Sequence, residues 1–469
     1  MSAGEVTPLR RNETPGERKT DAGNAKRLVA AHGEAFRYVH VWKTWLVWDG
    51  QRLKPDQSGE MRRLAKSVAQ ELFEEAVTYA DTDRRDKMLK HAGRSESLSG
   101  IRSMIELAAD EPGVPVTPDE LDADPWLFNA SNGTVDLRTG ERRPHGPEQL
   151  ITKVSPARYL PEAECPTWLA FLDRVLDHDD ELIEFVRRAL GYTLTGHTSE
   201  QVLFLLHGGG ANGKTTLLET VRHIAGDYAS QVPADTLMAT RMGGGIPNDL
   251  ARLPGARFVS AVETDEGRRL AEGLVKRITG GDTMTARFLH AEWFDFRPQF
   301  ALWLAANHLP AIQGTDDAIW RRIRLIPFNV QIPEAERDPH LDAKLKAEAD
   351  GILTWAIDGA IEWARNGLTQ PDAVLHASRS YRAEQDTLGE FLEECCVIDA
   401  NAWVPVGEFH HAYEAWCTDR GEKARGTKWL TQRLTPRGID RGQLPTGNRA
   451  RIYIGLGLAT NTNSSEQDL

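Results

Sequence analysis

Apolar positions recur at two different spacings along this chain. Between residues 21 and 195 they mostly return every three or four positions, which predicts amphipathic helices, interrupted by a strand hairpin over 36–48. Largely apolar runs then occur at 202–206, 258–262 and 300–306, and such runs are typical of strands buried on both faces of a parallel sheet. Helical spacing returns from 388 and ends in a short β-ribbon at 451–458. The pattern therefore predicts an α/β chain whose sheet lies in its central region.

Local details of the helical pattern lead to two further expectations. Asp21 is expected to cap a helix over 22–31. The vicinal pair Cys395 and Cys396 is expected on a buried helix face, because the four cysteines show no metal-ligand spacing. We therefore expect neither a structural zinc nor a disulfide.

The first apolar run leads directly into a glycine-rich loop. Residues 208–215, which we call the phosphate loop, have the pattern G-x-x-x-x-G-K-T and precede a predicted helix. In that context backbone N–H groups converge on a polyphosphate at the positive end of the helix. We expect Lys214 to reach the β- and γ-phosphates of ATP and the Thr215 hydroxyl to hold Mg²⁺. The other expected nucleotide-binding residues are Gly208, Gly210, Asn212, Gly213 and Thr216.

The second and third apolar runs end in polar side chains. Glu263, at the end of the second run, is expected to bind the metal-water system or to act as general base, with Asp265 and Glu266 as alternates. A solvated acidic turn is the other interpretation of this cluster. Asn307, at the end of the third run, can hydrogen-bond the γ-phosphate or orient the attacking water.

Arginines follow the third run at positions 321, 322 and 324. A guanidinium matches the charge that develops on a transferred phosphoryl group, and such a finger often comes from a neighbouring subunit. Arg321 is the preferred finger, with Arg322 and Arg324 left open. Pairing of these arginines with surface acids is the alternative.

The charge distribution changes the picture at the end of the chain. The chain has 469 residues and a net charge of −13, which argues against a generally basic nucleic-acid-binding surface. Residues 420–451 nevertheless contain nine basic and two acidic side chains, a net charge of +7. Three predicted helices followed by a hairpin fit a winged-helix plan, in which Arg449 and Arg451 are expected DNA contacts.

These motifs together resemble a known protein family. The phosphate loop, Glu263, the segment 280–287 (G-G-D-x-x-T-A-R), Asn307 and the segment 316–324 (D-D-A-I-W-R-R-I-R) occur in the order of the A, B, B′ and C motifs of superfamily 3 helicases. The set is most similar to the helicase part of phage and plasmid primases of the satellite-phage type, which are related to the poxvirus primase-helicase. Residues 21–28 (D-A-G-N-A-x-R-L) and 45–50 (W-L-V-W-D-G) resemble the region that precedes the helicase in that family.

The resemblance implies an AAA+-like P-loop ATPase that forms a homo-hexameric ring and moves 3′→5′ on single-stranded DNA. It also implies that a hairpin over about 283–296 enters the ring channel, with Lys276, Arg287 and His290 as candidate phosphate contacts. The tip of this hairpin reads Leu-His-Ala-Glu where family members often carry a lysine. Pairing of Arg287 with Glu263 or Asp282 is the alternative.

The expected organisation follows from the pattern and the resemblance together. It comprises a disordered tail (1–20), a mainly helical N-terminal domain (21–195), the AAA+-like ATPase (199–345), a helical linker (346–385), a winged-helix-like domain (386–460) and a second tail (461–469). No eighteen-residue apolar run or signal-peptide core is present, which predicts a cytoplasmic protein that does not bind membranes. The resemblance implies that its cell is a bacterium or a phage-infected host.

The preferred function is an ATP-dependent replicative DNA helicase of a phage, prophage or mobile element, acting on single-stranded and forked DNA. No primase motif precedes residue 199, so a separate primase is an expected partner. A replication initiator, in which ATP acts only as a switch, is the alternative. A packaging motor is less favoured because no nuclease carboxylate cluster follows the core.

Overall fold

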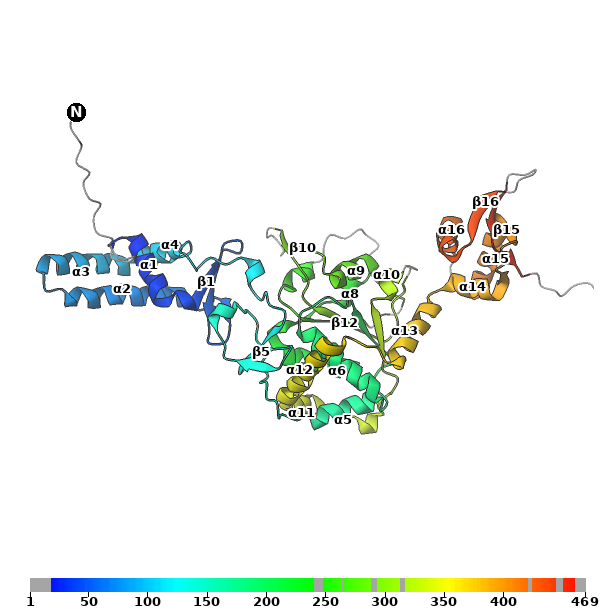
Figure 1. Ribbon diagram of the computed structural model, residues 1–469, viewed down its shortest axis with the longest axis horizontal. Coiled ribbons are helices and arrows are strands. Elements are labelled where there is room, and N and C mark those ends of the chain that lie inside the picture. The colour runs from blue at the N-terminus through cyan, green and yellow to red at the C-terminus, as the bar shows by residue number, and fades with distance from the viewer. Residues whose placement is uncertain are drawn as a thin grey trace, which may run out of the picture.

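The computed structural model describes residues 18–239, 248–263, 265, 267–287, 293–312, 317–420, 424–443 and 450–459. They form a mixed α/β chain with a parallel sheet at its centre, as the hydrophobic pattern predicts. Figure 1 shows an elongated arrangement, with a helical arm on one side of a central α/β body and a small C-terminal unit on the other. Within the described residues no helix is long and apolar enough to span a bilayer.

The arm consists of helices packed around a small antiparallel sheet. The predicted hairpin over 36–48 is confirmed, and a third strand extends it; the bounds are α1 (Asp21–His32), β1 (Phe36–Val39), β2 (Thr44–Trp48), β3 (Leu53–Pro55), α2 (Glu60–Thr78), α3 (Thr82–Glu96) and α4 (Leu98–Ala108). The expected cap of α1 is wrong by one residue, because the Thr20 hydroxyl accepts the Gly23 N–H at 3.1 Å. Asp21 is instead the first helical residue, where its carboxylate favours the positive helix end.

The central sheet is parallel throughout, in the order β13-β7-β12-β9-β8. Its strands are β7 (Leu203–His207), β8 (Ala229–Gln231), β9 (Phe258–Glu263), β12 (Ala301–Ala306) and β13 (Ile323–Pro327). Alternate residues of β12 enter two different hydrophobic clusters, so Trp303 packs on one face and Leu302 and Leu304 on the other. Burial of both faces explains the nearly continuous apolar runs in the sequence.

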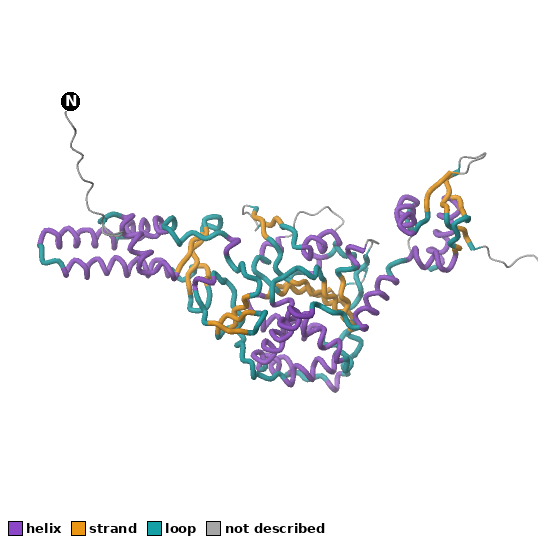
Figure 2. The backbone as a smooth tube through the Cα atoms, viewed as in Figure 1, coloured by secondary structure: helices purple, strands orange, loops and turns teal. Residues whose placement is uncertain are grey.

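Helices cover both faces of this sheet: Figure 2 shows a layer of helices beneath the strands, and Figure 1 shows α8 (Ala234–Leu237) and α9 (Glu272–Gly280) above them. The other segments in and around the body are β4 (Leu127–Ala130), β5 (Gly133–Asp136), β6 (Glu141–Arg143), α5 (Pro166–Val175), α6 (Asp180–Leu194), α7 (Lys214–Ala225), β10 (Met284–Ala286), β11 (Phe294–Phe296), α10 (Asp317–Trp320), α11 (Leu341–Ala347) and α12 (Ala349–Asn366). Helices α5 and α6 share one hydrophobic cluster with β7, β12 and α12. They therefore pack as part of the body, although they precede residue 195.

The C-terminal unit combines helices with two small sheets. Its elements, after the connecting helix α13 (Asp372–Glu384), are α14 (Thr387–Cys395), β14 (Cys396–Val397), β15 (Trp403–Pro405), α15 (Val406–Asp419), α16 (Thr427–Leu434), β16 (Asp440–Gln443), β17 (Arg451–Ile454) and β18 (Gly457–Leu458). The predicted continuous ribbon is divided, because Gly455 at φ +91° turns the chain; β17 pairs with β15 and β16, while β18 pairs with β14.

The prediction for the vicinal cysteines is wrong. Cys395 ends α14 and Cys396 begins β14, and both side chains are only half-buried. The helix stops between them, so they do not share one helix face.

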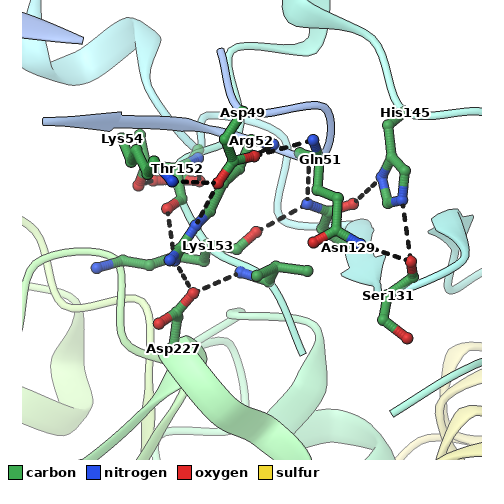
Figure 3. Close-up of polar contacts among 12 residues, drawn as sticks. Asp49, Gln51, Arg52, Lys54, Asn129, Ser131, His145, Thr152, Lys153 and Asp227 are labelled. Atoms are coloured by element: carbon green, nitrogen blue, oxygen red, sulfur yellow. Dashed lines mark hydrogen bonds and ion pairs between the residues drawn. The ribbon is translucent and has the colours of Figure 1, made fainter. Parts of the chain in front are cut away.

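A polar junction joins the arm to the body (Figure 3). The Arg52 guanidinium forms an ion pair with Asp49, which lies in the same turn between β2 and β3. It forms a second ion pair with Asp227, in the turn that directly follows α7. The Asp227 carboxylate also accepts the backbone N–H of Val154 at 3.1 Å. Beside this pair, the buried Asn129 amide donates to the carbonyl oxygens of Gln51 and Lys153 at 2.8 and 2.9 Å. The turn before β3 is thereby attached to the end of α7.

The contact between α6 and α12 generates a first test. A Cβ atom on Gly191 would lie 2.0 Å from the backbone nitrogen of Ala360, so the two helices approach too closely for any other residue. We expect Gly191→Ala to lower the free energy of unfolding by about 2 kcal/mol through overpacking, measured by denaturant titration. The matched control is Gly93→Ala on α3, where a Cβ meets open space. That variant should be more stable by about 0.5–1 kcal/mol, and equal effects of the two changes would contradict the close approach.

The polar junction generates a second test. Arg52→Ala should loosen the loop that Asp227 holds, costing about 1 kcal/mol because the ion pair is partly exposed. Faster hydrogen exchange at the Val154 amide would report this loss. Arg63→Ala removes a similar ion pair that lies wholly within α2, and it should leave Val154 exchange unchanged. Unchanged exchange in Arg52→Ala would mean that the junction does not depend on this pair.

Candidate functional site

The phosphate loop connects β7 to α7 at the carboxyl edge of the sheet. Close packing requires glycine at both of its ends. A Cβ on Gly208 would lie 2.1 Å from the Phe328 carbonyl oxygen, and one on Gly213 would lie 2.6 Å from a methyl carbon of Val175. Gly213 also has φ +88°, a left-handed conformation that favours glycine. The twelve-residue helix α7 begins at Lys214, so its first N–H groups face the loop.

Lys214 lies across the loop and reaches the neighbouring strand. Its Nζ donates to the carbonyl oxygens of Gly208 and Gly209 at 2.6 and 3.1 Å and to Oδ1 of Asn212 at 3.0 Å. A further bond of 3.2 Å goes to Oδ1 of Asn307, which directly follows β12. Burial lowers the pKa of Lys214 to about 8. An anionic phosphate would favour the charged form of this ammonium group.

Glu263 ends β9 at the same edge. Ala306, the last residue of β12, lies opposite both His207 of β7 and Glu263 of β9. The Glu263 side chain is 4% exposed, and its Oε1 accepts the Asp265 N–H at 2.8 Å. Its Oε2 is buried and has no hydrogen-bond partner among the described residues. Since an unpaired buried carboxylate oxygen is costly, this atom fits a bound water or a hydrated cation.

The remaining predicted loop residues differ in exposure. The Asn212 side chain is buried and donates to the Phe328 carbonyl oxygen at 3.1 Å. Thr215 and Gly210 are exposed, and Thr216 is half-buried. No cluster of three His, Cys, Asp or Glu side chains suited to a metal occurs among the described residues. A Mg²⁺ ion held mainly by nucleotide phosphates, water and the Thr215 hydroxyl is compatible with this donor set.

The three arginines lie at the opposite edge of the sheet. Residues 321 and 322 directly precede β13, whose first residue, Ile323, pairs with Leu203 at the start of β7. Arg322 is buried and donates to the Thr279 hydroxyl at 3.0 Å, and Arg324 donates to the Arg321 carbonyl oxygen at 2.6 Å. Arg321 is exposed. A strand of this length separates Arg321 from the phosphate loop by about 15–20 Å, so Arg321 does not meet Lys214 within one chain.

The candidate DNA contacts are distributed over two parts of the chain. Arg287 follows β10, and its guanidinium stacks on Trp293 at 4.5 Å rather than pairing with Glu263 or Asp282. Trp293 is 52% exposed, and its role beside Arg287 was not predicted from the sequence. The presence of a tryptophan and an arginine in the same predicted hairpin could have indicated this contact. Lys276 is half-buried on α9, whereas His290 and Glu266 lie outside the described residues.

The basic C-terminal segment is less positive than its sequence indicates. Arg420 pairs with Glu390 and Glu394, and Arg437 pairs with Asp386, so acids of α14 and its cap offset part of the +7 charge. Arg451 is exposed on β17, and Arg449 lies outside the described residues. On α16, the Trp429 ring contacts the guanidinium of Arg433 at 4.0 Å. This pair was not predicted from the sequence, although residues 429 and 433 are four positions apart and therefore lie on one face of a helix.

Comparisons with known proteins agree with the resemblance. Residues 25–177 match the family described as "D5 N terminal like", and residues 383–436 match the "Poxvirus D5 protein-like" family. A "Putative helicase" of Acanthamoeba polyphaga mimivirus is 28% identical over 72% of this chain and 37% of the relative. A "Putative helicase" of Frog virus 3 is 23% identical over 71% and 43%, and a "Putative primase" of African swine fever virus is 26% identical over 63% and 34%.

The fold also has a solved neighbour. The structure titled "The apo structure of NrS-1 C terminal region" aligns over 95% of this chain and 100% of that chain, with a TM-score of 0.50 and 12% identity. At this identity the likeness concerns the fold alone. The chain spans less than half the length of the viral relatives cited above. Its sequence thus contains D5 N-terminal-like and poxvirus D5-like regions, and the chain is related to proteins of large DNA viruses that are named "Putative helicase" and "Putative primase".

Proposed function

We propose that this chain is an ATP-dependent DNA helicase of superfamily 3 that serves replication of a phage, prophage or related element. The observation that carries the proposal is the edge where Lys214, Asn307 and Glu263 converge. A lysine inside a glycine loop, an amide on the next strand and a buried carboxylate beyond it are the groups that phosphoryl transfer to water requires. The viral relatives named as helicases support the same reading.

Each of these residues has a distinct task in ATP hydrolysis. Lys214 would exchange its bonds to the loop carbonyls for bonds to the β- and γ-phosphate oxygens of ATP. Asn307 would orient the lysine through Oδ1 and donate to the γ-phosphate through Nδ2. Glu263 would accept a proton from the attacking water at its unpaired Oε2. Mg²⁺, when held at the Thr215 hydroxyl, would neutralise charge on the phosphate oxygens.

Completion of this site calls for a second subunit. The exposed Arg321 lies at the amino edge of the sheet, whereas the phosphate loop lies at the carboxyl edge. A head-to-tail arrangement would bring Arg321 of one copy to the nucleotide of the next, and such heterologous contacts form a ring when the rotation between copies closes. A homo-hexamer is the ring that we propose. Its β10–β11 hairpin would offer Arg287 and Trp293 to the phosphates and bases of a single strand passing through the channel.

The C-terminal unit would supply a second contact to DNA. We propose a winged-helix arrangement, with α16 as the helix presented to the duplex and the β16–β17 pair as the wing. The exposed Lys428, Gln432 and Arg451 are its candidate contacts. The same unit favours the second candidate function, an initiator that uses ATP only as a switch, because duplex recognition needs no movement along a strand.

Strand displacement on a forked DNA with a free 3′ tail distinguishes these functions. With ATP, the wild-type protein should separate the strands, and Lys214→Ala and Arg321→Ala should both abolish separation. Loss of the finger should reduce ATP hydrolysis by about 10³-fold. Arg62→Ala, on the exposed side of α2, is the matched control and should unwind normally. ATP hydrolysis on DNA without displacement by the wild type would favour the initiator.

The lowered pKa of Lys214 predicts a pH dependence of nucleotide binding. As pH rises through about 8, the lysine of the nucleotide-free protein loses its proton, so binding must restore it. The Kd for ADP should therefore rise by up to about tenfold per pH unit above that value, with uptake of a proton measurable by calorimetry in two buffers. Lys214→Arg keeps the charge at all these pH values and should remove the dependence. Binding without proton uptake at pH 9 would contradict this role of Lys214.

A further inference from the structure

Gln201 occupies a strained position at the amino edge of the sheet. It lies two residues before β7, and its backbone N–H donates to the Thr198 carbonyl oxygen at 3.0 Å. Its φ of +51° is left-handed, a conformation that residues with a Cβ rarely adopt. Such conformations persist where the surrounding structure enforces them, and they concentrate at functional sites.

The Gln201 amide joins two arginines. Its Oε1 accepts Nη2 of Arg321 at 2.9 Å and Nη2 of Arg322 at 3.3 Å. Arg322 is only 7% exposed and is held by the Thr279 hydroxyl at 3.0 Å and the Ala318 carbonyl oxygen at 2.5 Å. Gln201 is thus fixed against an immobilised guanidinium and presents its remaining acceptor capacity to the exposed one.

We propose that Gln201 is a positioning residue, which holds the guanidinium of Arg321 in the direction of the neighbouring subunit's nucleotide. The proposal rests on the trans arginine of the proposed function. A free arginine side chain has many rotamers, and ordering it in advance lowers the entropy lost when it meets a phosphate. A neutral amide suits this task, because it accepts one N–H without neutralising the positive charge. A carboxylate in its place would compete with the phosphate for the same guanidinium.

The decisive variant is Gln201→Gly. Glycine adopts a φ of +51° without strain, so the substitution removes the amide while it relieves the backbone. The melting temperature of the variant should therefore not fall. This choice separates loss of the side-chain contact from loss of the local fold.

The test mixes two inactive proteins and measures ATP hydrolysis on single-stranded DNA. Lys214→Ala subunits lack a working phosphate loop but retain Arg321, whereas Arg321→Ala subunits have the reverse defect. A trans site predicts that the mixture regains activity at interfaces where the first donates its arginine to the second. Gln201→Gly is then placed in one partner at a time.

On the arginine-donating Lys214→Ala chain, Gln201→Gly should reduce the regained kcat by about tenfold with little change in KM for ATP, as expected for one charge-assisted hydrogen bond. On the Arg321→Ala chain it should have no further effect, since no finger remains there to be positioned. Equal loss in both placements, or loss in neither, would overturn the proposal. A mixture without Gln201→Gly that regains nothing would instead refute the trans finger itself, and with it the role of Gln201.

Discussion

The parallel register of the central sheet is the constraint on which the rest of the structure depends. It places the carboxyl ends of β7, β12 and β9 at one edge, so that residues almost a hundred positions apart can share a hydrogen bond. Trp303 helps to hold that register, because its ring stacks on Phe204 of β7 at 4.4 Å and its indole N–H donates to Thr193 of α6 at 3.0 Å. The buried side chain of Trp303 thus connects β12 to the neighbouring strand β7 and to the covering helix α6.

The two edges of this sheet carry different chemistry. The carboxyl edge collects groups that suit a polyphosphate, and the amino edge presents the exposed guanidinium of Arg321, which Gln201 links to the buried Arg322. In the proposed function, neither edge alone would hydrolyse ATP, because the loop of one copy would need Arg321 of the next. Assembly and chemistry are therefore inseparable in the proposed function, and dilution of the protein should act on its activity as strongly as a substitution does.

Sequence patterns predicted those parts of the molecule that are determined by residues close together in the chain. Apolar runs revealed the buried strands, and the glycine spacing marked the loop that precedes α7. Sheet order was not predictable, because periodicity does not say that β12 lies between β7 and β9, and the contact of Lys214 with Asn307 follows from that order. The same limit explains the overestimated charge of residues 420–451, since the neutralising acids belong to α14 and its cap. Gln201 gave no signal at all, because its role depends on a backbone turn that glutamine rarely makes.

The ion pair of Arg52 and Asp227 connects the arm to the end of α7, the helix that begins at the phosphate loop. Asp227 lies just beyond the last residue of α7, so any tilt of that helix on nucleotide binding would be passed to the turn that carries Arg52. The nineteen-residue helix α2 extends from this region as a lever about 28 Å long. A rotation of about 5° at its base would move its far end by about 2–3 Å, so a small tilt of α7 would become a displacement of the whole arm.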